Sequence, residues 1–217
     1  RYKTKVQACQ IIWRACFAER EPMNKVIIVG GGAAGMLASV IAARNGCEVL
    51  LFEKNEKLGK KVYITGKGRC NVTNNCDPEE LLHAVVSNPK FLYSAFYSFT
   101  SQDMMQLLED AGVSLKTERG NRVFPVSDHS SDIIRALERE LKKAGAQIHL
   151  HTEVKEVCTQ DEKVTGVLLS DETFFEADAV VVATGGLSYP STGSTGDGYR
   201  FASETGHKVV SQSQSLV

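Results

Sequence analysis

Apolar positions along the chain fall into short continuous runs separated by segments with helical spacing. The runs at 25–29 and 48–52 read KVIIV and EVLLF. Strands that are apolar throughout are typical of parallel sheets covered on both faces. Between these runs, residues 33–45 are rich in Ala and precede Gly46, which favours a helix closed by a left-handed residue. The pattern predicts a strand–helix–strand unit at the start of the fold.

The same reasoning predicts further elements downstream. Residues 131–144 are predicted as a helix because Ser131 can cap it, apolar residues follow at helical spacing, and Gly145 ends it. Close turn signals among residues 153–175 predict an antiparallel meander of three short strands. The remaining predicted elements are a helix at 91–111, an extended segment at 122–125, buried strands at 147–152 and 179–183, and a helix at 199–205.

These elements predict an α/β fold, with a parallel sheet and a small antiparallel β-meander. Residues 1–22 precede this pattern and are predicted as an N-terminal extension, either poorly ordered or a lone helix. The uncharged run 26–43 nears membrane-spanning length, roughly 17–25 residues. Its glycines and its change from β-branched residues to Ala favour a strand, a turn and a helix instead.

Charge and cysteine content narrow the possible partners. The 217 residues carry 25 Lys and Arg against 26 Asp and Glu, for a net charge of −1. This balance disfavours a dedicated nucleic-acid binder or a basic membrane-surface protein. The six cysteines show no metal-ligand spacing, which fits a reducing cytoplasm. We therefore expect a small-molecule substrate, no nucleic acid, no membrane and no metal, and the oligomeric state stays open.

A glycine-rich turn follows the first predicted strand. Residues 30–35 read GGGAAG, which matches G-x-G-x-x-G. In this motif Gly30 permits the tight turn, Gly32 lets the backbone approach a diphosphate, and Gly35 allows close helix–strand packing. The helix start offers amide groups to an anion. Glu53, at the end of the second strand, is placed to bind ribose hydroxyls and to repel a 2′-phosphate. The half-site predicts NAD or FAD.

Four further strings carry a family resemblance. Residues 63–74 read YITGKGRCNVTN and follow Gly59-Lys60-Lys61, and residues 122–127 read RVFPVS. The last predicted buried strand closes in Ala183-Thr184-Gly185-Gly186, and residues 194–200 read STGDGYR. From about residue 23 to residue 217, the chain resembles the flavoprotein family named variously aminoacetone oxidase-like, HI0933-like and bile-acid 4,6-reductase-like.

The resemblance implies a Rossmann-like FAD-binding domain of the two-dinucleotide-binding flavoprotein type. It implies FAD bound in extended form, a second domain inserted after the ATGG strand, and a C-terminal return segment. Both the insert and the return are missing here, so the chain is expected to be C-terminally truncated. The domain prediction is an extension at 1–22, an incomplete FAD-binding domain at 23–195, and the start of a truncated segment at 196–217.

The expected cofactor site combines the motif and the resemblance. Arg69 can neutralise a phosphate or polarise a flavin carbonyl, and Asn71 and Thr73 offer neutral hydrogen-bonding groups. The resemblance places the ATGG turn near FAD and makes the Val154 backbone a candidate contact to adenine. Asp197 is expected either to bind the cofactor or to cap the following helix. The full set is Gly30, Gly32, Ala33, Ala34, Gly35, Glu53, Lys54, Lys61, Gly68, Arg69, Cys70, Asn71, Thr73, Val154, Ala183, Thr184, Gly185, Gly186 and Asp197.

The expected function is that of a FAD-dependent oxidoreductase that transfers a hydride between flavin and a small organic substrate or nicotinamide. NAD(P)H is a candidate electron donor, and no catalytic residue is assigned. The alternatives are an NAD-dependent dehydrogenase and a non-catalytic nucleotide-binding fragment. Cys70 and Cys76 have C-x5-C spacing rather than the C-x4-C of disulfide reductases, so no redox disulfide is expected. His149 and His151 alternate along the predicted strand 147–152 and are expected on one sheet face, in a structural role.

Overall fold

The computed structural model describes residues 24–212, so the predicted extension at 1–22 and the last five residues lie outside the described part. Two compact units make up the chain. Unit 1 runs up to Lys60 and resumes at Leu141, and unit 2 comprises Lys61–Glu140.

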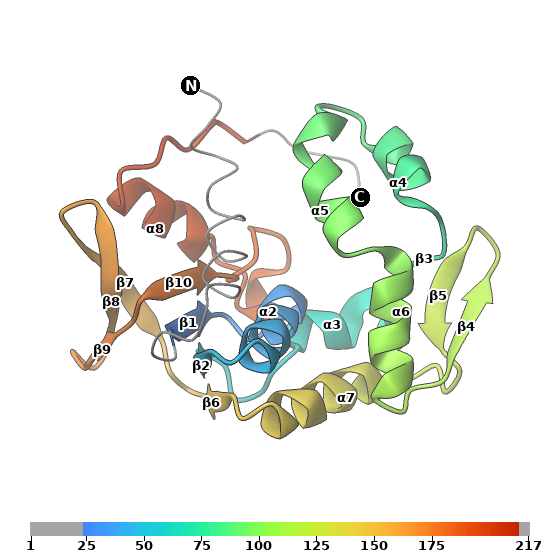
Figure 1. Cartoon of the computed structure of the whole chain (residues 1–217), viewed down its shortest axis with the longest axis horizontal. Helices are drawn as coiled ribbons and strands as arrows, with labels where there is room; N and C mark the ends of the chain where they lie inside the picture. The colour runs from blue at the N-terminus through green and yellow to red at the C-terminus, as the bar shows by residue number, and fades with distance from the viewer. Residues whose placement is uncertain (1–23, 213–217) are drawn as a thin grey trace. The chain divides into compact units, whose positions relative to one another are not determined.

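Unit 1 is built on a four-stranded parallel sheet (Figure 1). Its order is β10 (Ala179–Val182), β1 (Lys25–Val29), β2 (Glu48–Phe52) and β6 (Gln147–His149). Val29 pairs with Phe52, and Phe52 pairs with His149, so the strands end in register. The carboxyl ends therefore form one edge, where such sheets bind ligands. The predicted parallel sheet is confirmed.

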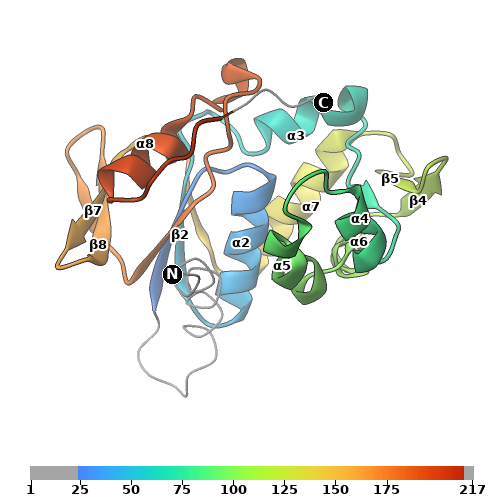
Figure 2. The ribbon, with the colours of Figure 1, turned by 90° about the horizontal axis from the view of Figure 1, so that it is seen from above.

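Different elements cover the two faces of this sheet. Helix α2 (Ala33–Arg44) packs on one face through the fully buried Met36 and Val40. The other face packs against the antiparallel meander of β7 (Val154–Gln160), β8 (Lys163–Leu169) and β9 (Phe174–Glu176). Figure 2 shows α2 on one side of β2, with the meander and α8 (Asp197–Glu204) on the other. Coverage of both faces explains why β1 and β2 are apolar almost throughout.

Strand β6 is shorter than predicted. It ends at His149, and His151 adopts a left-handed φ of +53°. The chain leaves the sheet because the amides of His151 and Thr152 donate to the carbonyls of Asn55 and Glu53, at 3.0 and 2.9 Å. The expected alternation of His149 and His151 along one strand is therefore wrong.

Unit 2 combines helices with a small antiparallel sheet of order β3–β5–β4. The predicted segment 122–125 is β5, whereas its partners β3 and β4 were not predicted. Helix α7 agrees with the prediction for 131–144 to within one residue. The elements in chain order are α3 (Lys60–Ile64), η1 (Thr65–Gly68), β3 (Thr73–Asn74), α4 (Pro78–Ala84), η2 (Pro89–Phe91), α5 (Tyr93–Ser98), α6 (Ser101–Asp110), β4 (Leu115–Glu118), β5 (Arg122–Pro125) and α7 (Ser130–Lys143), which continues into unit 1.

The single helix predicted at 91–111 is wrong, because the chain forms η2, α5 and α6 there. Phe99 is extended, with φ −148° and ψ 102°. Thr100 then caps α6: its hydroxyl accepts from the amide of Asp103, whose carboxylate accepts from the amide of Thr100. This capping box satisfies amides that a continuous helix would bond internally, so it makes the interruption stable.

The uncharged run 26–43 forms β1, the glycine turn and most of α2, as predicted. Among residues 24–212, no helix combines the length and the apolar character needed to cross a bilayer.

Candidate functional site

The glycine turn lies where β1 passes into α2. Gly30 has φ +106°, and a Cβ atom added there would lie 2.6 Å from the carbonyl oxygen of Ala183. A Cβ at Gly35 would lie 1.8 Å from the carbonyl oxygen of Gly30. These two glycines therefore let the turn, the helix and β10 pack closely. At Gly32 the added Cβ would meet nothing within 4 Å, so space is open beside this backbone.

The start of α2 offers amide groups to this open space. Its N-cap is Gly32, which has no side chain to cap the helix, and its first turn contains no acidic residue. The first intrahelical bond there runs from the amide of Met36 to the carbonyl of Gly32, at 2.9 Å. Amides before Met36 thus have no intrahelical acceptor, and together with the helix dipole they favour an anion.

Glu53 lies against the glycine turn at the end of β2. Its side chain is buried, and its Oε2 accepts from the amide of Gly31 at 2.7 Å. Its Oε1 accepts from the amide and the side-chain nitrogen of Asn55, at 2.8 and 2.6 Å. These three bonds fix the carboxylate beside the turn. A carboxylate offers about four acceptor positions, so it can still accept from a further hydroxyl group.

Lys54 connects the end of β2 to the start of α8. Its Nζ donates to Asp197 Oδ2 at 2.7 Å and to Thr195 Oγ1 at 2.8 Å. Burial acts to raise the pKa of Asp197, but hydrogen bonds from Lys54 and Thr195 outweigh it and lower this pKa. The N-cap of α8 is Gly196, with no side-chain cap. Asp197 therefore does not cap the helix, and its carboxylate is held by Lys54.

The ATGG turn follows β10 directly, beside the glycine turn. The amide of Ala183 donates to the carbonyl of Val29 at 2.8 Å, and Gly185 has φ +76°. The hydroxyl of Thr184 is buried and has no hydrogen-bond partner among the described residues. Since leaving a buried polar atom unpaired costs about 1–3 kcal/mol, this hydroxyl is a candidate for contact with a ligand.

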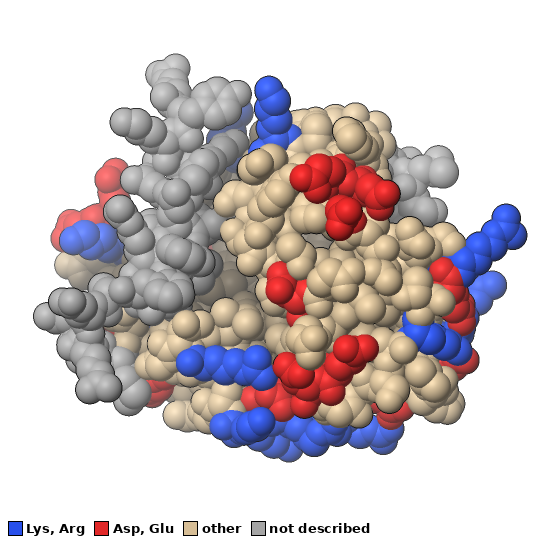
Figure 3. All heavy atoms as spheres, turned by 45° about the vertical axis from the view of Figure 1, so that its right-hand side comes forward, with Lys and Arg blue, Asp and Glu red and all other residues tan. Residues whose placement is uncertain are grey.

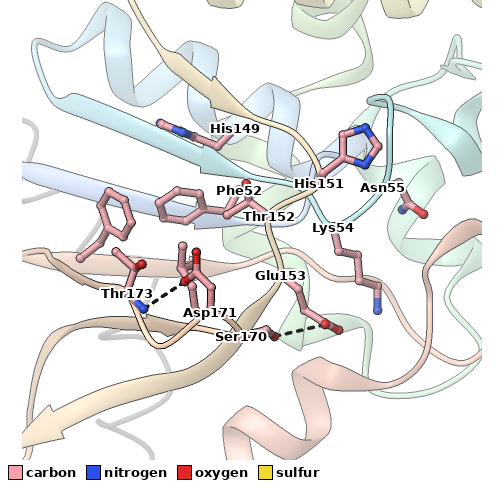
Figure 4. A pocket seen from close by; sticks show the side chains of 12 residues that line it. Phe52, Lys54, Asn55, His149, His151, Thr152, Glu153, Ser170, Asp171 and Thr173 are labelled. Carbon is pink, nitrogen blue, oxygen red and sulfur yellow. Dashed lines mark hydrogen bonds between the residues drawn. The ribbon is translucent and has the colours of Figure 1, made fainter.

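A pocket of about 710 Å³ opens at the same edge of the sheet, entirely within unit 1 (Figure 4). Three rings form an aromatic cluster in it: Phe52 lies 5.1 Å from His149 and 5.0 Å from Phe175 between ring centroids. Polar residues surround these rings. The lining residues are Phe52, Lys54, Asn55, His149, His151, Thr152, Glu153, Leu169, Ser170, Asp171, Thr173 and Phe175.

The pocket directly adjoins Glu53. The amide of Glu53 donates to the carbonyl of His149, and the amide of Thr152 donates to the carbonyl of Glu53, both at 2.9 Å. Apart from Lys54, none of the lining residues was predicted from the sequence to belong to the cofactor site. The available signal was that β2 and β6 end at the same edge, which brings Phe52 and His149 side by side.

In unit 2, the segment carrying the GKGRCN string has unusual backbone geometry. Gly66, Lys67 and Gly68 all have positive φ, at +55°, +58° and +87°, and Cys70 has +61°. A Cβ at Gly66 would lie 2.8 Å from the amide nitrogen of Asn71. Left-handed backbone at a non-glycine residue costs about 1–3 kcal/mol and is concentrated at functional sites. The loop thus has the strain expected of a binding segment.

Arg69 binds carboxylates of unit 2. Its Nε donates to Asp128 at 2.8 Å, its Nη2 donates to Glu118 at 2.5 Å, and its guanidinium lies 4.2 Å from the centroid of the Phe124 ring. Lys116 also donates to Asp128, at 2.8 Å. We call Arg69, Lys116, Glu118 and Asp128 the Arg69 cluster. The carboxylate partners of Arg69 were not predicted, because Glu118 and Asp128 lie 49 and 59 positions from it in the chain.

Charge pairing shifts the pKa values within this cluster. The hydrogen bond from Arg69 lowers the pKa of Glu118, and hydrogen bonds from Lys116 and Arg69 lower that of Asp128. Glu118 and Asp128 in turn raise the pKa of Arg69. In the structure, these carboxylates hold the guanidinium of Arg69. The predicted contact of Arg69 with a phosphate or a flavin carbonyl stays a prediction.

The remaining predicted residues divide between the units. Val154 begins β7 in unit 1 and pairs with Leu169, which lines the pocket. In unit 2, Asn71 is exposed, the Thr73 hydroxyl donates to Ser101 at 3.2 Å, and Lys61 is half-buried in α3. Cys70 is buried, and burial raises the pKa of its thiol.

Cys70 and Cys76 are free thiols in the structure. No group of three His, Cys, Asp or Glu side chains within residues 24–212 has the arrangement of a metal site.

The chain is similar to two curated proteins along most of its length. It is 35% identical over 194 residues to a ribosomal RNA dihydrouridine synthase of Haemophilus influenzae, covering 88% of this chain and 47% of that protein. It is 32% identical over 197 residues to a 3-dehydro-bile acid delta(4,6)-reductase of Clostridium scindens, covering 90% of this chain and 47% of that protein. The chain thus spans about half the length of these relatives.

A solved structure shares the fold. The 3-ketosteroid-delta4-(5alpha)-dehydrogenase of Rhodococcus jostii superimposes with a TM-score of 0.61 at 19% identity, over 80% of this chain and 48% of that one. This likeness confirms a Rossmann-like α/β fold with a parallel sheet and additional antiparallel strands. The model of the HI0933-like protein Rossmann domain matches residues 24–214, and the chain therefore belongs to this family.

Proposed function

We propose that this chain is the FAD-binding part of a flavin-dependent oxidoreductase. The observation that carries the proposal is the buried carboxylate of Glu53, held against a glycine turn whose helix start has no side-chain cap. This arrangement pairs an anion site with a hydroxyl-binding carboxylate, as the diphosphate and the ribose of a dinucleotide require. The relatives support the redox assignment, since one is named a reductase and the matching structure is a dehydrogenase.

The residues present fit the adenosine diphosphate half of FAD. Open space beside Gly32 leaves room for a diphosphate, and the amides of Ala33, Ala34 and Gly35 lie at the start of α2. Glu53 keeps acceptor capacity for a ribose hydroxyl, while its charge repels a 2′-phosphate. The unpartnered hydroxyl of Thr184 lies in the adjoining ATGG turn. FAD, when bound, supplies the hydride chemistry.

Within this proposal, the residues of the chain bind and orient the cofactor. The glycine turn fixes the diphosphate through backbone amides, which carry no side-chain entropy cost. Three donors hold the Glu53 carboxylate in place before any ligand arrives, so its orientation is set in advance. The ion pair of Lys54 with Asp197 ties the end of β2 to α8. These contacts suit binding rather than proton transfer, and we assign no catalytic residue.

We propose a small organic molecule as the substrate and NAD(P)H as the electron donor. The face shown in Figure 3 carries Lys and Arg beside Asp and Glu among its described residues, without one sign of charge covering it. Such a face gives no broad attraction for a polyanion. One relative is named for an RNA substrate and the other for a bile acid, so the part they share with this chain fits a common cofactor better than a common substrate.

Flavin binding by two variants tests the proposal. We expect Gly32→Val to fill the open space beside the turn and Glu53→Ala to remove the ribose acceptor, so that each strongly lowers FAD retention. Glu56→Ala is the matched control, because Glu56 is an exposed carboxylate of the same loop and pairs with Lys60 on the surface. FAD content is read from flavin absorbance after gel filtration, and melting temperatures verify folding.

Normal flavin content in both Gly32→Val and Glu53→Ala would contradict the proposal. Titration with NAD separates the main alternative: a chain that binds NAD and not FAD is an NAD-dependent dehydrogenase fragment. FAD binding without any reduction by NADH or NADPH in the longest available form of the protein would contradict the proposed electron donor.

A further inference from the structure

His149 presents an unsatisfied polar atom inside the pocket of unit 1. Its Nε2 is buried and has no hydrogen-bond partner among the described residues. The imidazole lies tilted against two phenyl rings, at 5.1 Å from Phe52 and 6.3 Å from Phe175 between ring centroids. In a neutral imidazole, each ring nitrogen is either a donor or an acceptor, so Nε2 lacks a partner in both tautomers. A structural role alone leaves this atom unexplained.

The position of the pocket limits which part of a ligand can reach it. Its rim is bonded directly to the backbone of Glu53, through the carbonyl of His149 and the amide of Thr152. On the other side of Glu53, the carboxylate contacts the amide of Gly31 in the glycine turn. The glycine turn, the Glu53 carboxylate and the pocket thus follow one another. This is the order of the diphosphate, the ribose and the base in a nucleotide.

We infer that His149 recognises the purine base of the bound dinucleotide and gives the site its preference for adenine nucleotides. This inference rests on the proposed function and adds a specificity-determining residue to it. The ring edge of a purine presents both acceptor nitrogens and, in adenine, an amino donor, so it can pair with Nε2 in either tautomer. The ring of Phe175 is only partly buried, so it can supply a face on which a base stacks.

The walls of the pocket are consistent with a neutral, planar ligand group. The rim is ordered by hydrogen bonds from the Ser170 hydroxyl to Glu153 at 3.2 Å and from the Thr173 amide to Asp171 at 3.0 Å, both dashed in Figure 4. Two carboxylates on this rim disfavour a second phosphate. The volume of about 710 Å³ leaves ample room for a base. Figure 4 shows His151 at the other end of the pocket from the His149 ring.

The substitution His149→Phe separates recognition of the base from packing of the ring. It keeps an aromatic ring against Phe52 and Phe175 and removes only the polar edge. Without ligand, we expect the melting temperature of the variant to rise, because a buried unpaired nitrogen is replaced by an apolar ring edge. With FAD, we expect binding about threefold to tenfold weaker, because one hydrogen bond to the base is lost.

The ratio of the affinities for two nucleotides is a readout that a change in side-chain packing alone does not alter. Isothermal titration compares ADP with UDP, which share the ribose and the diphosphate and differ in the base. The wild-type chain should prefer ADP, and His149→Phe should reduce the ADP-to-UDP affinity ratio about threefold to tenfold, mainly through ADP. His83→Phe is the control, because His83 is an exposed histidine of α4 in unit 2, and it should leave the ratio unchanged.

The outcomes distinguish this inference from the proposed function. If the wild-type chain binds FAD and His149→Phe keeps both the FAD affinity and the ADP-to-UDP ratio, the inference is wrong and the proposed function stands. If His149→Phe lowers the melting temperature and weakens ADP and UDP equally, His149 is structural and the inference is again wrong. If the wild-type chain binds neither FAD nor ADP, both fail.

Discussion

Two segments with expected cofactor residues are built on different physical principles. In unit 1, the glycine turn depends on the absence of side chains, because Cβ atoms at Gly30 and Gly35 would collide with backbone. In unit 2, the loop at 66–70 depends on residues with left-handed backbone and on an arginine that two carboxylates hold. The first segment is fixed by close backbone packing, of Gly35 against Gly30 and of Gly30 against Ala183. The second is fixed by ion pairs between side chains, from Arg69 to Glu118 and Asp128.

The comparison shows that each kind of site has its own weakness. A close-packed backbone tolerates no added atom, because the neighbouring carbonyl groups cannot move away without displacing a strand. A partly exposed ion-pair cluster tolerates substitution better, because water replaces lost contacts and screens the remaining charges. Substitutions of similar size should therefore have unequal effects on the two segments.

The largest effect is expected from Gly35→Ala. Its Cβ would lie 1.8 Å from the carbonyl oxygen of Gly30, so α2 and β1 must separate, at a cost of about 3 kcal/mol or more in the free energy of unfolding. Denaturant titration measures this loss. Gly32→Ala is the matched control and should cost less than about 1 kcal/mol, because its Cβ meets nothing within 4 Å. Equal losses in the two variants would contradict the packing argument.

A smaller effect is expected from Arg69→Met. It leaves Glu118 and Asp128 with Lys116 as their shared cation and removes the guanidinium from the Phe124 ring. We expect faster limited proteolysis within unit 2 and a modest fall in melting temperature. Arg135→Met removes an exposed i,i+3 pair with Asp132 on α7 and should change little. If the two variants behave alike, the Arg69 cluster does not stabilise unit 2.

The smallest effect is a pH dependence. The pKa values of Glu118 and Asp128 lie below their ordinary values of 4.5 and 3.8, so folding favours their charged forms. Their stabilising contribution is complete above these ordinary values and is lost as the pH falls through the lowered pKa values. Melting temperatures from about pH 7 to about pH 3 should therefore fall less steeply below pH 4.5 in Arg69→Met than in the wild type. Parallel curves would contradict this coupling.

Local pattern predicted the elements whose causes are local. The strands at 25–29 and 48–52 and the helix from Ser130 were predicted within about a residue, because apolar runs and capping residues lie inside each element. The break between α5 and α6 was missed although Thr100 and Asp103 carry its signal, because the apolar spacing on both sides suggested one helix. Strands β3 and β4 were missed because they are short and depend on pairing with β5.

The sequence by itself determined the strand–turn–helix of unit 1, the place of Glu53 after β2 and the family to which the chain belongs, because these depend on spacing along one segment. Only the tertiary structure decided that the carboxylate bonds to Gly31, that Asp197 pairs with Lys54 and that Arg69 is held by Glu118 and Asp128. It alone placed His149 beside Phe52 and Phe175. Such contacts join residues far apart in the chain, so their partners are set by strand register and packing rather than by local sequence.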